Sequence, residues 1–122
     1  MNLEQLQAMS NKELNELSAV KVMGWKLKHM HGYKEDAFMI NEAEFDIKFI
    51  SYWNPTTDMN DVWMLVKKMH DDCYGFALGN IDDEWSAWFI KPDATIHHKD
   101  EGRIVCKEAS RAITIASILA KE

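Results

Sequence analysis

The chain has 122 residues, of which 47% are hydrophobic and 28% are charged, as is typical of a single globular domain over residues 1–122. Its formal net charge of -6 argues against general DNA binding, which depends on a basic surface. No apolar run approaches the ~20 residues of a membrane-spanning helix, so no membrane association is expected.

The two cysteines, Cys73 and Cys106, are too few for a disulfide framework. The first residues have no basic stretch followed by an apolar one, which is the pattern of a secretory signal. We therefore expect reduced thiols and a cytoplasmic location.

The first quarter of the chain predicts a helix. Ser10 and Glu13 have the spacing of a capping box, and the helix is expected to run to about Met23. Gly24 follows as its C-terminal residue in a left-handed conformation.

Two strands are predicted next, after a basic loop over residues 26–36. A short strand is expected over 37–41. A second, over 44–52, alternates well, because Phe45, Ile47 and Phe49 fall on one side and polar residues on the other.

The second half predicts a helix, a group of strands and a last helix. Thr57 or Asp58 is expected to cap the first of these helices. The helix is expected to bury a face of Val62, Leu65, Val66 and Met69, and Trp63 and Trp85 are assigned to the core. Strands are expected over 73–79, 84–90 and 103–106, joined by turns at 80–83 and 100–102. Ser110 is expected to cap the last helix. The order favours an α+β fold, with helices packed on both faces of an antiparallel sheet.

The turn before the helix near residue 58 is a candidate anion site. Thr56 and Thr57 can offer backbone amides and hydroxyls to a pyrophosphate, with Asn54 beside them. The alternative is an ordinary helix cap.

Arginines and aromatic side chains supply the other candidate ligand contacts. Arg103 and Arg111 suit phosphate groups, and the alternative is a solvated or ion-paired side chain. The aromatic residues offer flat faces to a base, and the alternative for each is core packing. These candidates are Trp25, Trp53, Phe76 and Trp88.

Metal binding and catalysis find little support. The histidines and cysteines match no zinc spacing, and adjacent His97 and His98 on a strand would point to opposite faces. No GxSxG, HExxH or P-loop motif is present. We expect no metal, no cofactor and no enzymatic activity.

Several segments resemble the phage ABA sandwich domain family over roughly residues 13–120. The resemblance rests on Val22-Met23-Gly24-Trp25, the turn Pro55-Thr56-Thr57-Asp58, Trp63, the strand from Trp85 to Phe89, and the small residues after Ser110. The chain departs from the family pattern in its basic 26–36 loop and at Ser110, where proline is common. The resemblance implies a sandwich of helices and antiparallel sheet.

One branch of that family resembles the Thoeris anti-defence sponge proteins. This resemblance implies a homo-oligomer that binds a cyclic ADP-ribose isomer made by a TIR-domain enzyme and sequesters it without cleavage in the infected bacterium. The apolar residues on more than one face of the last helix also indicate an oligomer. The alternatives are a phage accessory protein of the same fold acting through protein contacts, and a small nucleotide hydrolase.

Overall fold

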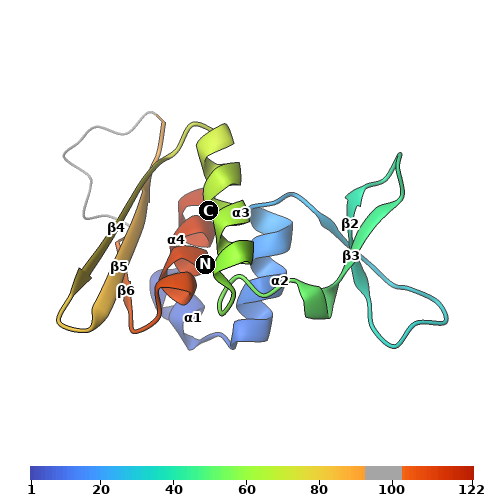
Figure 1. Cartoon of the computed structure of the whole chain (residues 1–122), viewed down its shortest axis with the longest axis horizontal. Helices are drawn as coiled ribbons and strands as arrows, with labels where there is room; N and C mark the ends of the chain where they lie inside the picture. Colours follow the sequence, from blue (N-terminus) through green and yellow to red (C-terminus); the bar gives the residue numbers. More distant parts are fainter. Residues whose placement is uncertain (93–102) are drawn as a thin grey trace.

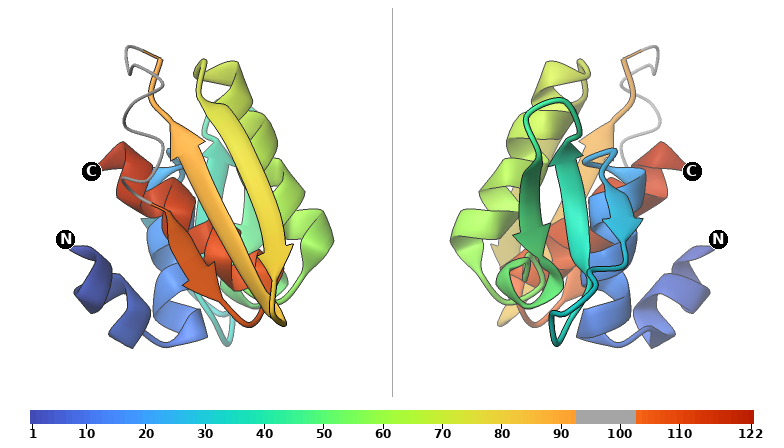
Figure 2. Two further views of the ribbon diagram at one scale, coloured as in Figure 1. Left: turned by 90° about the vertical axis from the view of Figure 1, so that its left-hand side faces the viewer. Right: turned by 90° about the vertical axis from the view of Figure 1, so that its right-hand side faces the viewer.

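A layer of helices lies between two antiparallel sheets in the computed structural model, which describes residues 1–92 and 103–122 (Figure 1). The first sheet has the order β1-β2-β3 and the second the order β4-β5-β6. The two sheets close opposite sides of the molecule (Figure 2). The α+β class, with antiparallel strands and helices packed on them, is confirmed. The strands form two sheets, however, and the helices fill the space between them.

Local sequence signals set where the N-terminal helices begin and end. Asn2 and Ser10 each form a capping box, at the start of α1 (Leu3–Ala8) and α2 (Asn11–Lys21). Gly24 has a φ of 74°, as expected for a left-handed residue after a helix, and the Trp25 amide donates to the Ala19 carbonyl.

The first sheet consists of β1 (Lys26–Lys28), β2 (Ala37–Asn41) and β3 (Asp46–Phe49). The predicted strand 37–41 is confirmed, and the predicted 26–36 loop begins with β1. The second predicted strand ends early, because Ile50–Tyr52 form a 3-10 helix, η1. Phe45 is exposed and has a φ of 51°, so it belongs to the turn and not to the buried side of the strand.

Helix α3 (Met59–Asp71) is capped by Asp58, whose carboxylate accepts from the Asn60 amide at 2.8 Å. Val62, Leu65 and Met69 are buried, as their spacing predicts. The core assignment of Trp63 is wrong, since this side chain is 48% exposed. It follows Val62 by one residue, a rotation of about 100°, which turns it away from the buried stripe.

The second sheet contains β4 (Gly75–Ile81), β5 (Glu84–Ile90) and β6 (Ile104–Cys106). The hairpin turns at Asp82 and Asp83, both with positive φ, so Asn80 and Ile81 still belong to the strand. Trp85 is half-buried rather than fully in the core. The predicted turn 100–102 and His97 and His98 lie outside the described residues.

Helix α4 (Ala109–Lys121) forms the centre of the molecule. It contacts β5 and β6 on one side and all three other helices, and it is buried from Ala112 to Ile118. Its apolar faces are therefore used inside one chain, and they no longer indicate an oligomer. Ser110 does not cap this helix: the N-cap is Glu108, and the Ser110 hydroxyl donates to the Thr56 carbonyl at 2.6 Å.

Candidate functional site

A cavity of about 470 Å³ lies between α2, the first sheet and the segment that leads into α3. Its volume falls in the range of small-molecule sites. Phe38 and Ile50 are its apolar residues apart from Trp53, and the remaining lining is mainly amides, hydroxyls and charged groups. The lining residues are Asn11, Lys12, Asn15, Glu16, Glu35, Phe38, Ile50, Ser51, Trp53, Asn54, Thr56 and Thr57.

Trp53 anchors the segment that closes the cavity. Its side chain is fully buried, and its indole Nε1 donates to the Asn15 carbonyl at 3.0 Å and to the Ser18 hydroxyl at 3.1 Å. Trp25 packs edge-on against it, with ring centroids 4.8 Å apart, and is also buried. Both rings thus lie in the core, which was the alternative for each candidate, and Trp53 presents no open face to a base.

Asn15 holds the turn before α3. Its side-chain oxygen accepts from the Thr56 amide at 3.1 Å and from the Thr56 hydroxyl at 2.9 Å. The Thr57 amide donates to the Asn54 carbonyl. The expectation that these two amides are free for an anion is wrong, because both are already bonded within the protein.

Asn54 is fixed from two sides. Its amide donates to the Asp61 carboxylate at 2.8 Å, and its side-chain nitrogen donates to the Ser51 carbonyl at 2.7 Å. Thr57 is exposed at the cavity, so of the predicted turn residues it is the one most open to a ligand.

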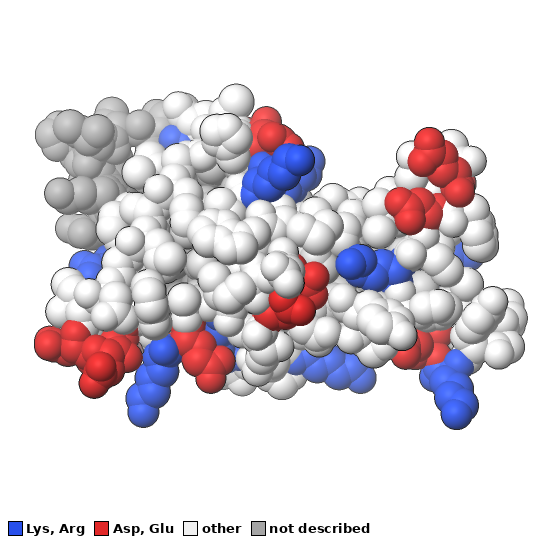
Figure 3. All heavy atoms as spheres, viewed as in Figure 1, with Lys and Arg blue, Asp and Glu red and all other residues white. Residues whose placement is uncertain are grey.

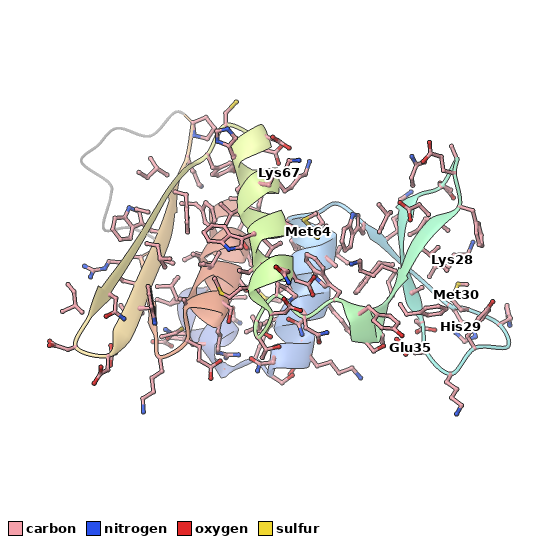
Figure 4. The ribbon with its side chains drawn as sticks, in the orientation of Figure 1. Lys28, His29, Met30, Glu35, Met64 and Lys67 are labelled. Carbon is pink, nitrogen blue, oxygen red and sulfur yellow. The ribbon has the colours of Figure 1, made fainter. Side chains whose placement is uncertain are left out.

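The rim of the cavity carries both signs of charge. Lys12 and Glu16 come from the exposed side of α2, and Glu35 comes from the loop before β2, beside η1 (Figure 4). The Glu35 carboxylate accepts from the Ser51 amide at 2.8 Å and hydroxyl at 2.9 Å, so it joins the loop to η1. A ligand here would meet one cation, two carboxylates and several amide groups.

The sequence reasoning did not find Asn15, Glu35, Phe38 or Ser51. Asn15 carried a signal, because it is a polar residue next to Leu14 and three residues before Ser18 on the buried side of α2. No sequence pattern points to Glu35 or Ser51, because the hydrogen bonds between them join residues sixteen positions apart.

Arg111 lies at the junction of α1, α2 and α4 and is not one of the cavity-lining residues, although it bonds one of them, Asn11. Its guanidinium donates to the Gln7 carbonyl at 3.1 Å, to the Met9 carbonyl at 2.9 Å and to the Asn11 side chain. These bonds occupy donors that the sequence reasoning assigned to phosphate. Arg111 also lines a second, more open hollow with Cys106, whose pKa is raised above its ordinary value by burial.

Phe76 and Trp88 lie on the second sheet and Arg103 directly precedes its strand β6, across the helical layer from the cavity (Figure 1). Arg103 stands 5.7 Å from the Trp88 ring and donates weakly to the Ser86 hydroxyl at 3.4 Å. Phe76 stacks on Phe89, at 4.9 Å between centroids. The fold therefore gathers Trp53, Asn54, Thr56 and Thr57 at the cavity and leaves the other candidates in separate places.

The histidines of the basic loop make local contacts. His29 bonds the Asp36 carboxylate at 2.9 Å, and its ring lies 4.9 Å from that of His31. Within residues 1–92 and 103–122, no group of three histidine, cysteine or acidic side chains is arranged to hold a metal ion. In the same ranges, no helix is long and apolar enough to cross a bilayer.

Comparison with known proteins identifies the family. The model of the phage ABA sandwich domain matches residues 16–118, which is most of the chain, and the chain belongs to this family. Searches of curated proteins and of solved structures found no match. The match includes the second half of α2, both sheets and most of α4. Of the twelve residues that line the cavity, nine lie within the match, and Asn11, Lys12 and Asn15 lie before it.

Proposed function

We propose that this phage protein binds a cyclic ADP-ribose isomer in the cavity between α2 and the first sheet and sequesters it without cleavage, which would block Thoeris immunity. The observation that carries the proposal is the cavity itself. It has the volume of a small-molecule site, with an apolar wall and a polar rim, in a chain of the phage ABA sandwich family.

The rim chemistry supports a nucleotide-like ligand. Lys12 can pair with a phosphate, and the amide side chains of Asn11 and Asn54 can bond the edge of a base. Ribose hydroxyls can donate to the Glu16 carboxylate. Ile50, which is half-buried at the cavity, gives the flat base an apolar surface. The two carboxylates disfavour a ligand that is only polyphosphate.

Binding without cleavage agrees with the residues at the cavity. The lining residues given above include no histidine and no cysteine, which are the common bases and nucleophiles of nucleotide hydrolysis. Ser51 donates its hydroxyl to Glu35, and this bond holds the loop. Sequestration also gains from slow release, which a site rigidified by Trp53 and Asn15 favours.

The test is recovery of the ligand. The protein is incubated with a cyclic ADP-ribose isomer, free ligand is removed, and the protein is denatured by heat. We expect intact ligand in the released fraction, at about one molecule per cavity. Linear ADP-ribose that accumulates with time would show a hydrolase, and the absence of any released ligand would contradict the proposal.

A pair of charge reversals tests the location. Lys12→Glu at the cavity rim should weaken binding at least tenfold by calorimetry, because it replaces the cation nearest the phosphates with an anion. Lys21→Glu is the matched control, since it makes the same change in the same helix outside the cavity. Equal effects of the two variants would place the ligand elsewhere.

An accessory role through protein contacts is the second candidate. It is favoured by large apolar side chains exposed around the first sheet, at Leu27, Tyr33, Phe45 and Tyr52. Under this role, the protein would release no nucleotide, and changes at these side chains would weaken capture of a phage or host protein while Lys12→Glu would not.

A further inference from the structure

Strand β4 is a long edge strand without the usual protection. It pairs with β5 on one side, and the strand order places no other strand of the described chain on its other side. Its seven residues, Gly75–Ile81, include no charged residue and no proline. Natural edge strands are commonly short, charged or interrupted, because open N–H and C=O groups recruit another strand.

The other edges of the molecule do show such protection. In the first sheet, β1 is only three residues long and carries Lys26 and Lys28. Strand β3 is four residues long and carries Asp46 and Lys48. In the second sheet, β6 spans three residues. The unprotected character of β4 is therefore specific to this strand.

The surface beside β4 is suited to burial. On α3, Met59 and Trp63 are 41% and 48% exposed, and the Trp63 ring packs edge-on against Phe76 of β4 at 6.4 Å. The view toward this edge shows a mainly uncharged surface over β4 and α3 (Figure 3). Aromatic and methionine side chains that are exposed together on a face poor in charge are typical of protein interfaces.

Charges stand at the two ends of this surface. The hairpin tip after β4 carries Asp82, Asp83 and Glu84. Toward the other end of the strand, the last turns of α3 carry Lys67 (Figure 4) and Lys68 next to Asp71 and Asp72, and both signs of charge are seen there in Figure 3. The middle of the surface is thus open to apolar contact, the hairpin end is acidic, and the α3 end carries both signs of charge.

We propose that β4 pairs with β4 of a second copy of this chain, in antiparallel orientation, and that the two second sheets join into one six-stranded sheet. An antiparallel strand is complementary to itself about a two-fold axis, so one segment satisfies both partners and the assembly closes at a dimer. No residue of Gly75–Ile81 would place a charge against another.

The distribution of charge favours this orientation. Antiparallel pairing separates the two acidic hairpin tips to opposite ends of the joint, and each then lies toward the α3 end of the other copy, where Lys67 and Lys68 stand beside Asp71 and Asp72. Parallel pairing would place six carboxylates together. With Leu78 on the axis, Gly75 faces Ile81 and Phe76 faces Asn80 of the second copy, while Trp63 lies beside the joint.

The joint is remote from the cavity, which is lined by α2 and the first sheet. The proposal therefore does not depend on the proposed function. Two chains would carry two open cavities.

Mass measurement of the full chain tests the pairing. Light scattering after size exclusion, at tens of micromolar, should give twice the 14.2 kDa of one chain. Ala77→Lys puts a charge on the outer face of β4 and should return the mass to that of one chain. Val105→Lys is the matched control, because it makes a similar change on the outer face of β6 at the opposite edge and should leave the dimer intact.

A second variant separates loss of pairing from loss of folding. Trp63→Glu changes an exposed side chain of α3 and should raise the dimer dissociation constant at least tenfold while the circular dichroism spectrum stays unchanged. A wild-type mass of one chain up to 100 µM would overturn the proposal. A dimer that persists in both Ala77→Lys and Trp63→Glu would also overturn it. Pairing of β4 only with a strand of another protein would overturn it as well.

Discussion

Asn15 is the residue that joins α2 to the turn before α3. Its side-chain oxygen accepts both donors of Thr56, and its backbone carbonyl accepts from Trp53. Since Thr56 and Trp53 are fully buried, their donors have no access to water as a substitute. One amide side chain therefore satisfies both buried donors of Thr56 in the cavity wall.

Replacing Asn15 with alanine tests this role. The Thr56 amide and hydroxyl would be left buried without an acceptor, so we expect a loss of about 1–3 kcal/mol in the free energy of unfolding. Urea denaturation measures it. Lys12→Ala is the control on the same helix and should change stability by less than about 0.5 kcal/mol. Equal stability of the two variants would contradict the role of Asn15.

Arg111, like Asn15, uses its side chain to join separate elements of the fold by hydrogen bonds. It donates to the carbonyls of Gln7 and Met9 at the end of α1, and thus satisfies groups that the short helix leaves open. Arg111→Ala should lower stability by about 1–3 kcal/mol, the range for losing a hydrogen bond to a charged group. Arg103→Ala, whose contact with Ser86 is long, is expected to have a smaller effect in the same assay. A larger effect at Arg103 would show that this assignment is wrong.

At the scale of elements, the sequence was sufficient to predict the helix ends and buried faces that depend only on neighbouring residues. The Ser10–Glu13 box, Gly24 and the buried stripe of α3 are all set within one or two turns of chain, and all three are confirmed. The division into two sheets was not predicted: every pairing joins strands that are consecutive in sequence, and the packing of the helices between the two groups of strands keeps the groups apart. The prediction of the site was wrong because the site depends on residues distant in sequence: Asn15 accepts from the donors of Thr56, 41 residues away.

Helix α4 shows how an apolar pattern has two explanations. Residues that are apolar on more than one face indicate either an interface or a central helix. Only the three-dimensional arrangement decides, and here both the second sheet and the other helices cover α4. The prediction of a homo-oligomer now depends on the β4 edge instead.

The ends of α3 and α4 are joined by Asp72. Its carboxylate accepts from Lys121 at 2.6 Å and lies 3.5 Å from Lys68, and the hydrogen bond from Lys121 lowers the pKa of Asp72 below its ordinary value. A carboxyl with a lowered pKa in the folded state adds stability that is complete above the unfolded pKa and is lost as the pH falls through the folded pKa.

Asp72→Asn should therefore lower the free energy of unfolding at pH 7, by less than about 1 kcal/mol because the pair is partly exposed. The difference from wild type should shrink as the pH falls below about 4. Asp71→Asn, at the neighbouring exposed position, is the control. A difference that grows toward low pH in denaturation experiments would contradict the assignment.

On the scale of the whole molecule, the two sheets are attached unequally. Strands β4 and β5 are seven residues long, and α4 packs against β5. The first sheet has strands of three to five residues, with β1 fully exposed and mainly β2 buried. Few buried apolar contacts and short ladders are the features of a segment that opens at low free energy.

Hydrogen exchange should therefore be faster in β2 and β3 than in β4 and β5. The cavity lies between α2 and this more weakly attached sheet, so a ligand in it would contact both and hold them together. At a ligand concentration one hundred times the dissociation constant, the added stability of about 2.7 kcal/mol should slow exchange in β2 and β3 about a hundredfold. Mass spectrometry with a cyclic ADP-ribose isomer measures this, and Lys12→Glu should show less slowing at the same concentration. Unchanged exchange in the first sheet at saturating ligand would place binding outside this cavity.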